Sequence, residues 1–262
     1  MITSIRNPLI KQIRKLHRTK GRREEGLLLL EGTHLVETAY EANCSLMTLC
    51  YTEQWRTRYP QLWENVSKKV QRLELVSLEV LTAMTTTINP DGVVATALFE
   101  PFTEGEITDF RLGLVIERLQ DPGNLGTIIR TAAATGIDGI WLSDDSVDVD
   151  HPKVLRASAG AWFQVPIFIS SDLKRIVEKY KNNGFNIVAT LPNTTQTYWH
   201  LQLTKPTLIL LGNEGSGLSD SLVSLANEIV SIPLSEGIES LNVAIATALI
   251  LYEAKRQQIF NE

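Results

Sequence analysis

The second half of the chain alternates short apolar segments with segments of helical pattern. The apolar segments predict strands at residues 112–118, 139–143, 185–191, 207–211 and 228–233. Helices are expected to begin near Gly123, Ser170 and Ser219, and a last helix is expected over residues 240–259. Because several of these strands are apolar throughout, both of their faces must be covered. The pattern therefore predicts an open α/β domain with helices on both faces of a parallel sheet.

The first hundred residues show a second alternation of strands and helices. Asn7 and Pro8 form a helix start, with Asn as the cap and Pro at the first helical position. Strands at 27–30, 46–52, 73–76 and 93–99, separated by helices, predict an α/β layer domain. Residues 100–109 are polar and contain Pro and Gly, which is typical of a linker. We therefore expect two domains, 1–100 and 111–262, joined by a linker at 101–110.

Positive charge is concentrated at the start of the chain. The net charge is −5, yet residues 1–25 carry eight basic and two acidic side chains, a net +6 that leaves −11 for the rest. Screening over about 10 Å limits the influence of the acidic remainder, so this stretch is expected to attract RNA phosphates. The residues assigned to RNA are Lys11, Arg14, Lys15, Arg18, Lys20, Arg22 and Arg23. The alternative is an ordinary solvated helix face; the continuation of the run into a predicted turn at Gly21 favours RNA.

Composition argues against several other classes of protein. The sequence has no apolar signal segment and no stretch of about 20 apolar residues, so it does not predict a membrane protein. Cys44 and Cys50 suit a reducing cytoplasm, and the histidines lack the spacing of a metal site. The acidic run at 144–150 lacks the Gly and Glu of a calcium loop, since Val149 and Leu155 stand at those positions. We expect a cytoplasmic protein without a metal, with this acidic loop away from bound RNA.

Three loops follow predicted strands at the edge where such sheets bind ligands. Residues 119–140 contain Asn124, a potential helix cap, and Arg130. Residues 211–220 read LGNEGSGLSD and contain Glu214, which alone would be an ordinary exposed turn carboxylate. Residues 232–253 place Ser240 and Asn242 before an apolar helix. The glycine-rich loop lacks both the P-loop ending and the dinucleotide fingerprint, which disfavours a nucleotide-dependent enzyme of another class, such as an oxidoreductase.

Together, in this order and spacing, the loops resemble the three motifs of the SpoU family of SPOUT-class RNA methyltransferases. The matching segments are N-x5-R-T at 124–131, GNEGSGLS at 212–219 and IPL…ESLNVAIA at 232–246. SAGAWFQVPI at 158–167 is similar to a further family segment, and residues 7–37 resemble the accessory RNA-binding domain, which is similar to ribosomal L30e. The resemblance implies an L30e-like α/β/α domain followed by a SPOUT α/β domain with a deep trefoil knot.

The resemblance also implies a cofactor and a set of site residues. S-adenosylmethionine is expected to bind at Leu211, Gly212, Asn213, Gly217, Ile232, Leu234, Leu241 and Asn242. The implied catalytic set is Arg130, Asn124, Glu214, Ser240 and Asn242. In this interpretation Arg130 engages a ribose 2′-hydroxyl, either as a base or as a charged group that orients it, and the others supply hydrogen bonds. A neutral guanidine is costly, so the charged role is the favoured one.

The implied activity is methyl transfer to a ribose 2′-hydroxyl, in 23S ribosomal RNA, by a homodimer formed through the C-terminal domain. Two alternatives stay open within the family, a transfer RNA 2′-O-methyltransferase and an inactive module that only binds RNA.

Overall fold

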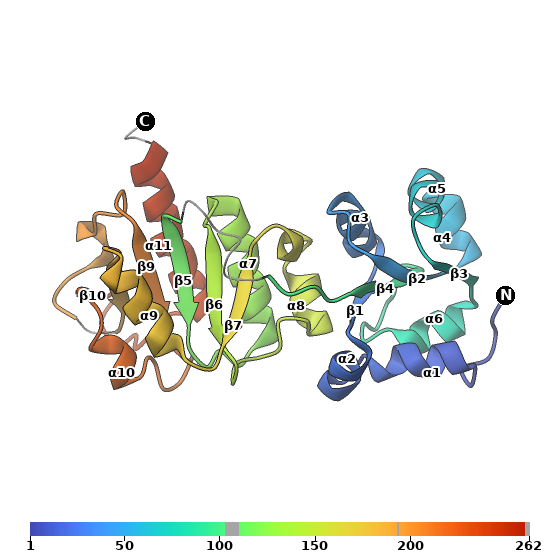
Figure 1. Ribbon diagram of the computed structural model, residues 1–262, viewed down its shortest axis with the longest axis horizontal. Coiled ribbons are helices and arrows are strands. Elements are labelled where there is room, and N and C mark those ends of the chain that lie inside the picture. Colours follow the sequence, from blue (N-terminus) through green and yellow to red (C-terminus); the bar gives the residue numbers. More distant parts are fainter. Residues whose placement is uncertain (103–109, 193, 260–262) are drawn as a thin grey trace. The chain divides into compact units, whose positions relative to one another are not determined.

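The computed structural model describes residues 1–102, 110–192 and 194–259, and its contacts divide the chain into two compact units (Figure 1). Unit 1 comprises Met1–Glu100 together with Asp148–Gln164, and unit 2 comprises Pro101–Val147 and Val165–Glu262. Residues 148–164, which we expected in the second domain, group with unit 1 by their contacts, and the domain boundaries stay a prediction. Most of the predicted linker, residues 103–109, lies outside the described residues. None of the described helices is long and apolar enough to cross a membrane.

Unit 1 is an α/β/α sandwich, as expected. Its helices are α1 (Pro8–Lys15), α2 (Thr19–Glu25), α3 (Thr33–Glu41), α4 (Glu53–Arg58), α5 (Pro60–Ser67), α6 (Leu78–Met84) and α8 (Pro152–Ala157). Its strands are β1 (Leu27–Glu31), β2 (Leu46–Tyr51), β3 (Arg72–Leu75) and β4 (Val93–Leu98), in the order β1-β4-β2-β3. Only β2 and β3 pair in parallel. In Figure 1, α3, α4 and α5 lie on one side of this sheet and α1, α2 and α6 on the other.

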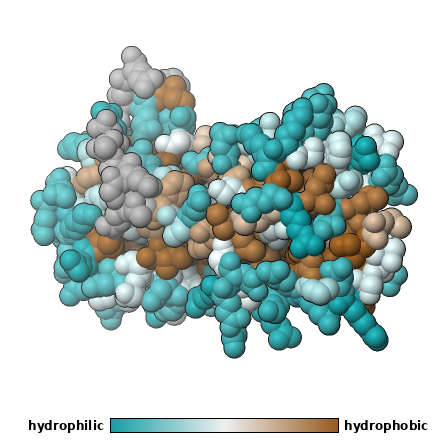
Figure 2. Space-filling view, turned by 45° about the vertical axis from the view of Figure 1, so that its right-hand side comes forward, coloured by the Kyte–Doolittle hydropathy of each residue, from teal (hydrophilic) through white to brown (hydrophobic). Residues whose placement is uncertain are grey.

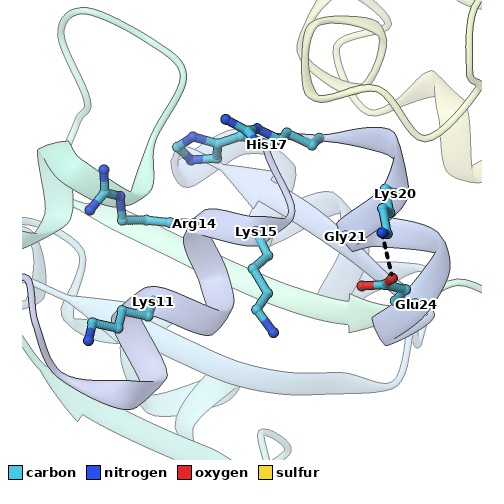
Figure 3. Close-up of a pocket in the computed structure, with 8 residues that line it drawn as sticks. Lys11, Arg14, Lys15, His17, Lys20, Gly21 and Glu24 are labelled. Carbon is cyan, nitrogen blue, oxygen red and sulfur yellow. Dashed lines mark ion pairs between the residues drawn. The ribbon is translucent and has the colours of Figure 1, made fainter.

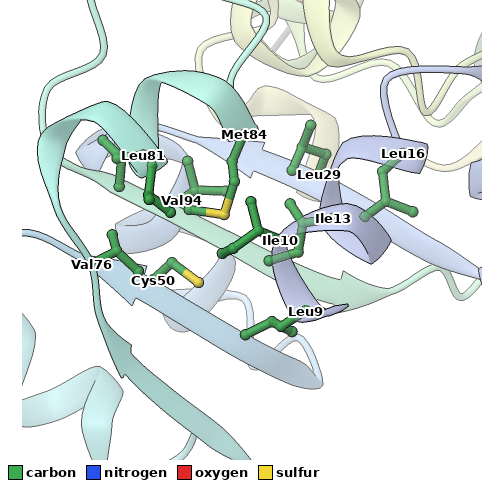
Figure 4. Packing of buried hydrophobic residues seen from close by; sticks show 11 residues of the cluster. Leu9, Ile10, Ile13, Leu16, Leu29, Cys50, Val76, Leu81, Met84 and Val94 are labelled. Atoms are coloured by element: carbon green, nitrogen blue, oxygen red, sulfur yellow. The ribbon is translucent and has the colours of Figure 1, made fainter. Parts of the chain in front are cut away.

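Helix α1 forms where the capping signal predicts it. The Asn7 side chain accepts a hydrogen bond from the backbone N–H of Leu9 at 2.9 Å, and Pro8 is the first helical residue. Ile10, Ile13 and Leu16 are buried against the sheet and α6 (Figure 4). One face of the helix is thus fixed by the core, which leaves its basic side chains outside.

Residues 21–26 were expected as a turn, but all except Gly26 belong to the helix α2, so that prediction was wrong. Gly21 allows this helix to approach α1 closely, because a Cβ there would lie 2.1 Å from the carbonyl oxygen of Lys15. The helix also turns Arg22 inward, where the residue is 2% exposed. Its Nη2 lies 2.9 Å from Asp148 Oδ2 and its Nε lies 2.9 Å from Asp150 Oδ2. Arg22 is therefore a structural ion-pair residue, and its assignment to RNA binding was wrong.

The acidic run at 144–150 was expected away from bound RNA as an ordinary loop. Instead, Asp148 belongs to unit 1 and contacts the basic stretch directly. It accepts hydrogen bonds from Thr19 Oγ1 at 2.6 Å and from Arg23 Nη2 at 3.2 Å, in addition to Arg22. Nearby in the same unit, Arg156 Nη1 donates to the buried carboxylate of Glu31 at 2.7 Å. The segment 148–164 is thus anchored to unit 1 by charged hydrogen bonds.

Unit 2 contains the predicted parallel sheet. Its strands are β5 (Leu112–Ile116), β6 (Gly139–Ser143), β7 (Ile167–Ser170), β8 (Asn186–Thr190), β9 (Thr207–Leu211) and β10 (Glu228–Val230). They follow the order β10-β8-β9-β5-β6-β7, and every pair is parallel. Strand β7 was not predicted. Strands β6 and β9 have the expected ends, and the ends of β5, β8 and β10 lie within three residues of the expected ones.

Helices cover both faces of this sheet. The helices are α7 (Pro122–Thr135), α9 (Leu173–Asn182), α10 (Asp220–Val223) and α11 (Val243–Ile259). Helices α7 and α11 pack together behind the sheet in Figure 1, and α9 lies in front of it. Under α9, Phe110, Trp141 and Tyr180 pack with ring centroids 4.9–5.1 Å apart. Both faces of the sheet are therefore shielded from solvent, which accounts for the continuous apolar runs of these strands.

The ion pairs of Arg22 generate a stability prediction. Arg22→Met should lower the free energy of unfolding by about 3–5 kcal/mol, because it leaves the carboxylates of Asp148 and Asp150 without their buried partner. Lys20→Met is the matched control, because Lys20 pairs with Glu24 at 3.7 Å on the surface and should leave stability nearly unchanged. Denaturant unfolding of both variants measures the difference. Equal stabilities for the two variants would contradict a structural role for Arg22.

Candidate functional site

The candidate site lies at the carboxyl ends of β5 and β9, which are neighbours in the middle of the sheet. From β5 the chain continues to β6 on one side, and from β9 it continues to β10 on the other. This divergence is a topological switch point, the place where open α/β sheets bind ligands. Two of the three motif loops begin here.

The glycine-rich loop after β9 is closed by its own backbone. Asn213 and Gly217 exchange backbone hydrogen bonds of 3.1 and 3.0 Å, and Asn213 Oδ1 accepts from the N–H groups of Gly215 and Ser216. Gly217 has φ +68°, a region that favours glycine. At Gly212 a Cβ would lie 2.2 Å from the backbone of Gly217. The glycines are therefore needed for the loop to close, whatever it binds.

Two hydrogen bonds attach this loop to the end of β5. Asn213 Nδ2 donates to the carbonyl oxygen of Arg118 at 2.7 Å. Glu117 Oε2 accepts from the backbone N–H of Ser219 at 2.7 Å. Sequence reasoning missed both Glu117 and Arg118. Their position directly after a buried strand was the available signal, since the ends of parallel strands are where loops converge.

A relay of side chains joins all three motif loops. Glu214 accepts hydrogen bonds from the N–H groups of Gln120 and Asp121 at 3.3 and 3.2 Å, and from Asn124 Nδ2 at 3.1 Å. Asn124 Oδ1 in turn accepts from Asn242 Nδ2 at 2.9 Å. Asn242 Oδ1 accepts from the backbone N–H of Ala244 at 2.9 Å and so caps α11. Each amide in the relay has one orientation, because its donor and acceptor ends are both engaged.

The relay lowers the pKa of Glu214. Partial burial opposes ionisation, but hydrogen bonds from its own loop, Asn124, Asp121 and Gln120 outweigh that effect, and the pKa of the carboxyl lies below its usual value. The negative charge also lies at the N-terminal end of α7, where the helix dipole favours it. Glu214 is therefore an ionised anchor in this structure.

Asn124 is not the helix cap that the sequence suggested. Asp121 caps α7, since its side chain accepts from the N–H of Asn124 at 2.8 Å, and Pro122 opens the helix. Asn124 lies within the first turn, and its side chain is thereby left for the relay. Three of the residues expected in the catalytic set, Asn124, Glu214 and Asn242, are thus brought together.

The other two lie apart from this relay. Arg130 lies on the exposed side of α7, six residues after Asn124, which corresponds to about 9 Å along a helix. Within the described part of the chain no hydrogen bond or ion pair holds its guanidinium. Ser240 is exposed before α11, and its hydroxyl has no partner among residues 1–102, 110–192 and 194–259.

The residues expected at the cofactor lie on the loops around this edge. Leu211 is buried at the end of β9, and Gly212, Ile232, Leu234 and Leu241 are half-buried. The backbone groups of Gly212, Ile232 and Leu241 make no hydrogen bond with any residue that the structure describes. Half-buried backbone groups without a partner are suited to a ligand that satisfies them. This backbone therefore fits the expected cofactor.

Over the described ranges, no group of three or more His, Cys, Asp or Glu side chains is arranged to hold a metal ion.

The basic residues of unit 1 form a pocket of about 500 Å³ on α1 and α2 (Figure 3). Lys11, Arg14 and Arg18 are exposed and have no acidic partner in the described structure. Lys15 lies 3.6 Å from Glu25, and Lys20 lies 3.7 Å from Glu24. Arg23 shares Asp148 with Arg22 but stays 73% exposed. Six of the seven residues assigned to RNA are therefore on the surface, and Arg22 is not.

Two family models match the chain, one in its C-terminal part and one in its N-terminal part. Residues 111–252 match the SpoU rRNA methylase family, and residues 7–95 match the MRM3-like substrate binding domain. The chain belongs to the SpoU rRNA methylase family. Its three motif loops are the ones that the relay joins.

Relatives that cover nearly the whole chain agree with this assignment. An uncharacterized tRNA/rRNA methyltransferase of Synechocystis is 49% identical over 98% of this chain and 94% of its own. The 23S rRNA (guanosine(2553)-2′-O)-methyltransferase RlmP of Bacillus subtilis is 31% identical over 97% of this chain and 98% of its own. The crystal structure of an AdoMet-bound rRNA methyltransferase from Sinorhizobium meliloti is 31% identical, with a TM-score of 0.87 over 97% of each chain.

The depressed pKa of Glu214 generates a prediction about pH. The stabilisation that depends on the ionised carboxylate is present above the usual Glu pKa of about 4.3 and is lost as the pH falls through the lowered pKa of the folded protein. Glu214→Gln should therefore be less stable than wild type at neutral pH, and the difference should vanish in acid. Denaturant unfolding across this range measures it, with Glu239→Gln, an exposed carboxylate, as control. A constant difference between Glu214→Gln and wild type at every pH would contradict the anchor role.

Proposed function

We propose that this protein transfers a methyl group from S-adenosylmethionine to a ribose 2′-hydroxyl in ribosomal RNA. The observation that carries the proposal is the relay Glu214–Asn124–Asn242, which joins the three SpoU motif loops at the switch point of the sheet. Support for the 2′-hydroxyl comes from RlmP, whose name specifies 2′-O transfer to 23S RNA. Transfer RNA remains the alternative substrate, since the Synechocystis relative is named for both RNAs.

The chain's own backbone is suited to hold the cofactor. Gly212, Ile232 and Leu241 would bind it through their unpartnered N–H and C=O groups, beside the buried Leu211. The sulfonium cofactor supplies an electrophilic methyl group when bound. The residues of the chain must then align the ribose oxygen and accept the developing charge, which is chiefly a matter of positioning.

Arg130 is the residue that we assign to the 2′-hydroxyl. Its guanidinium is exposed and without a partner in the described residues, so it is available to an RNA substrate. As a permanent cation with a planar fork of donors, it can orient the hydroxyl and bind the adjacent phosphate. The relay, about two turns away at the N-terminal end of α7, connects the three motif loops.

Unit 1 supplies the general attraction for RNA in this proposal. Residues 7–95 match a substrate binding domain, and the pocket on α1 and α2 presents Lys11, Arg14 and Arg18, which have no acidic partner in the described structure. Contacts of this kind position an RNA backbone without reading its bases.

Three further expectations stay predictions: a homodimer, a trefoil knot and a cytoplasmic location. Hydrophobic residues reach the surface of the molecule among hydrophilic ones (Figure 2). On α11, Ile245, Leu249 and Tyr252 are 53%, 38% and 55% exposed at helical spacing, and this stripe is the surface that we assign to the dimer.

Arg130 gives the direct test of the catalytic proposal. Arg130→Ala should retain the fold and cofactor binding and lose most methyl transfer, and Arg130→Lys should lose at least about 10² in rate, because it keeps the charge but not the planar fork. Single-turnover rates with saturating cofactor and ribosomal RNA isolate this step. Arg175→Ala, an exposed arginine on α9, is the control. Near-wild-type rates for Arg130→Ala would remove the residue from the mechanism.

The basic pocket predicts a change in salt dependence. Replacing Arg14 and Arg18 together by Ala should weaken RNA binding and reduce the log–log slope of affinity against salt by about two, roughly 0.9 for each lost phosphate contact. Binding to ribosomal RNA at several salt concentrations measures this slope. Lys68→Ala, which removes a lysine paired with Glu64 on α5, should leave it unchanged. If the double variant keeps the wild-type slope, the pocket is an ordinary solvated surface.

A further inference from the structure

Arg118 has an unusual backbone conformation directly after β5. Its φ is +55°, a region that non-glycine residues rarely adopt. Three hydrogen bonds hold it there. Its N–H donates to Ser143 Oγ at 2.8 Å, and its carbonyl oxygen accepts from Asn213 Nδ2 at 2.7 Å and from Gln120 Nε2 at 3.0 Å. All three engage backbone atoms, so glycine would satisfy them without strain. The arginine side chain therefore needs a separate explanation.

The guanidinium of Arg118 is incompletely paired. Its Nη2 lies 3.5 Å from Glu117 Oε2, which is a long contact for an ion pair. Its Nε is buried and has no hydrogen-bond partner. The side chain as a whole remains 39% exposed, so a ligand can reach it. A buried donor without an acceptor is unfavourable, so the protein itself does not fully satisfy this guanidinium.

The side chain lines a pocket of about 210 Å³ at the carboxyl ends of β5, β6 and β7, entirely within unit 2. The charged residues of its lining are Glu117, Arg118, Asp144, Asp145, Asp172 and Lys174. Four carboxylates against two cations disfavour a phosphate. Asp144 and Asp145 are exposed, and their carboxylates accept no hydrogen bond from the described residues. The pocket thus offers unpaired donors and unpaired acceptors to a neutral ligand.

We propose that this pocket binds a guanine base of the RNA substrate. Guanine carries the acceptors O6 and N7, to which arginine binds in bidentate fashion, and an amino group that a carboxylate accepts. Its N1–H lies beside that amino group, so one edge presents two donors to Asp144 or Asp145. The other RNA bases lack this combination of two adjacent donors and two adjacent acceptors. An unpaired base of an RNA loop is the form that proteins read in this way.

The inference rests on the proposed RNA substrate, but its test uses nucleosides and requires no methyl transfer. Saturation-transfer NMR would measure binding of guanosine, 7-deazaguanosine, inosine and adenosine to the full chain, with saturating S-adenosylhomocysteine to block the cofactor pocket. Guanosine should bind about tenfold or more tightly than the others, since 7-deazaguanosine lacks N7 and inosine lacks the amino group. Equal binding of adenosine and guanosine would overturn the proposal.

Arg118→Gly is the decisive variant, because glycine accepts φ +55° and should keep or raise the melting temperature. In this variant guanosine and 7-deazaguanosine should bind equally weakly. If Arg118→Gly binds guanosine as wild type does, the assignment is wrong.

Asp144→Asn combined with Asp145→Asn should likewise abolish the preference for guanosine over inosine, and a retained preference would overturn the carboxylate contacts. Loss of methyl transfer to RNA with guanosine binding intact would count against the proposed function alone.

Discussion

The relay from Glu214 through Asn124 to Asn242 is the interaction on which the candidate site depends. Its three members lie about 30 to 120 residues apart in sequence, in the glycine-rich loop, in the first turn of α7 and directly before α11. The ionised carboxylate accepts hydrogen bonds from two backbone N–H groups and from the amide of Asn124. The amide of Asn242 binds Asn124 and also caps the N-terminus of α11. One charge thus connects the three loops that carry the backbone assigned to the cofactor.

Unit 1 uses charge differently. In α2 the buried guanidinium of Arg22 forms ion pairs with Asp148 and Asp150. The basic side chains of α1 are exposed on the surface. A buried guanidinium paired with two carboxylates serves structure, whereas an exposed one without an acid attracts phosphate. The same short basic stretch therefore contributes to stability and, in our proposal, to RNA binding.

The sequence allowed most strands and the grouping of the motif residues to be predicted, for identifiable reasons. Strands such as β5 and β9 are apolar throughout, and the spacing of the motifs carries the family resemblance.

Strand β7 was missed because it is four residues long and half of it is not buried. Helix α2 was missed because it is charged and contains Gly21, whose role is a close approach to Lys15. The burial of Arg22 could not be foreseen, since its partners lie 126 and 128 residues later. The positive φ of Arg118 depends on tertiary hydrogen bonds to Ser143 and Asn213, which no local pattern reports.

We propose that this chain methylates a ribose 2′-hydroxyl in ribosomal RNA. The purified protein can be incubated with S-adenosylmethionine and ribosomal RNA from cells that lack it, and the phosphodiester bonds that resist alkaline hydrolysis can then be mapped. We expect a new resistant bond at a defined nucleotide, because a methylated 2′-oxygen cannot attack the adjacent phosphate. Methyl incorporation into a base, or no incorporation into ribosomal RNA under conditions in which the cofactor binds, would contradict it.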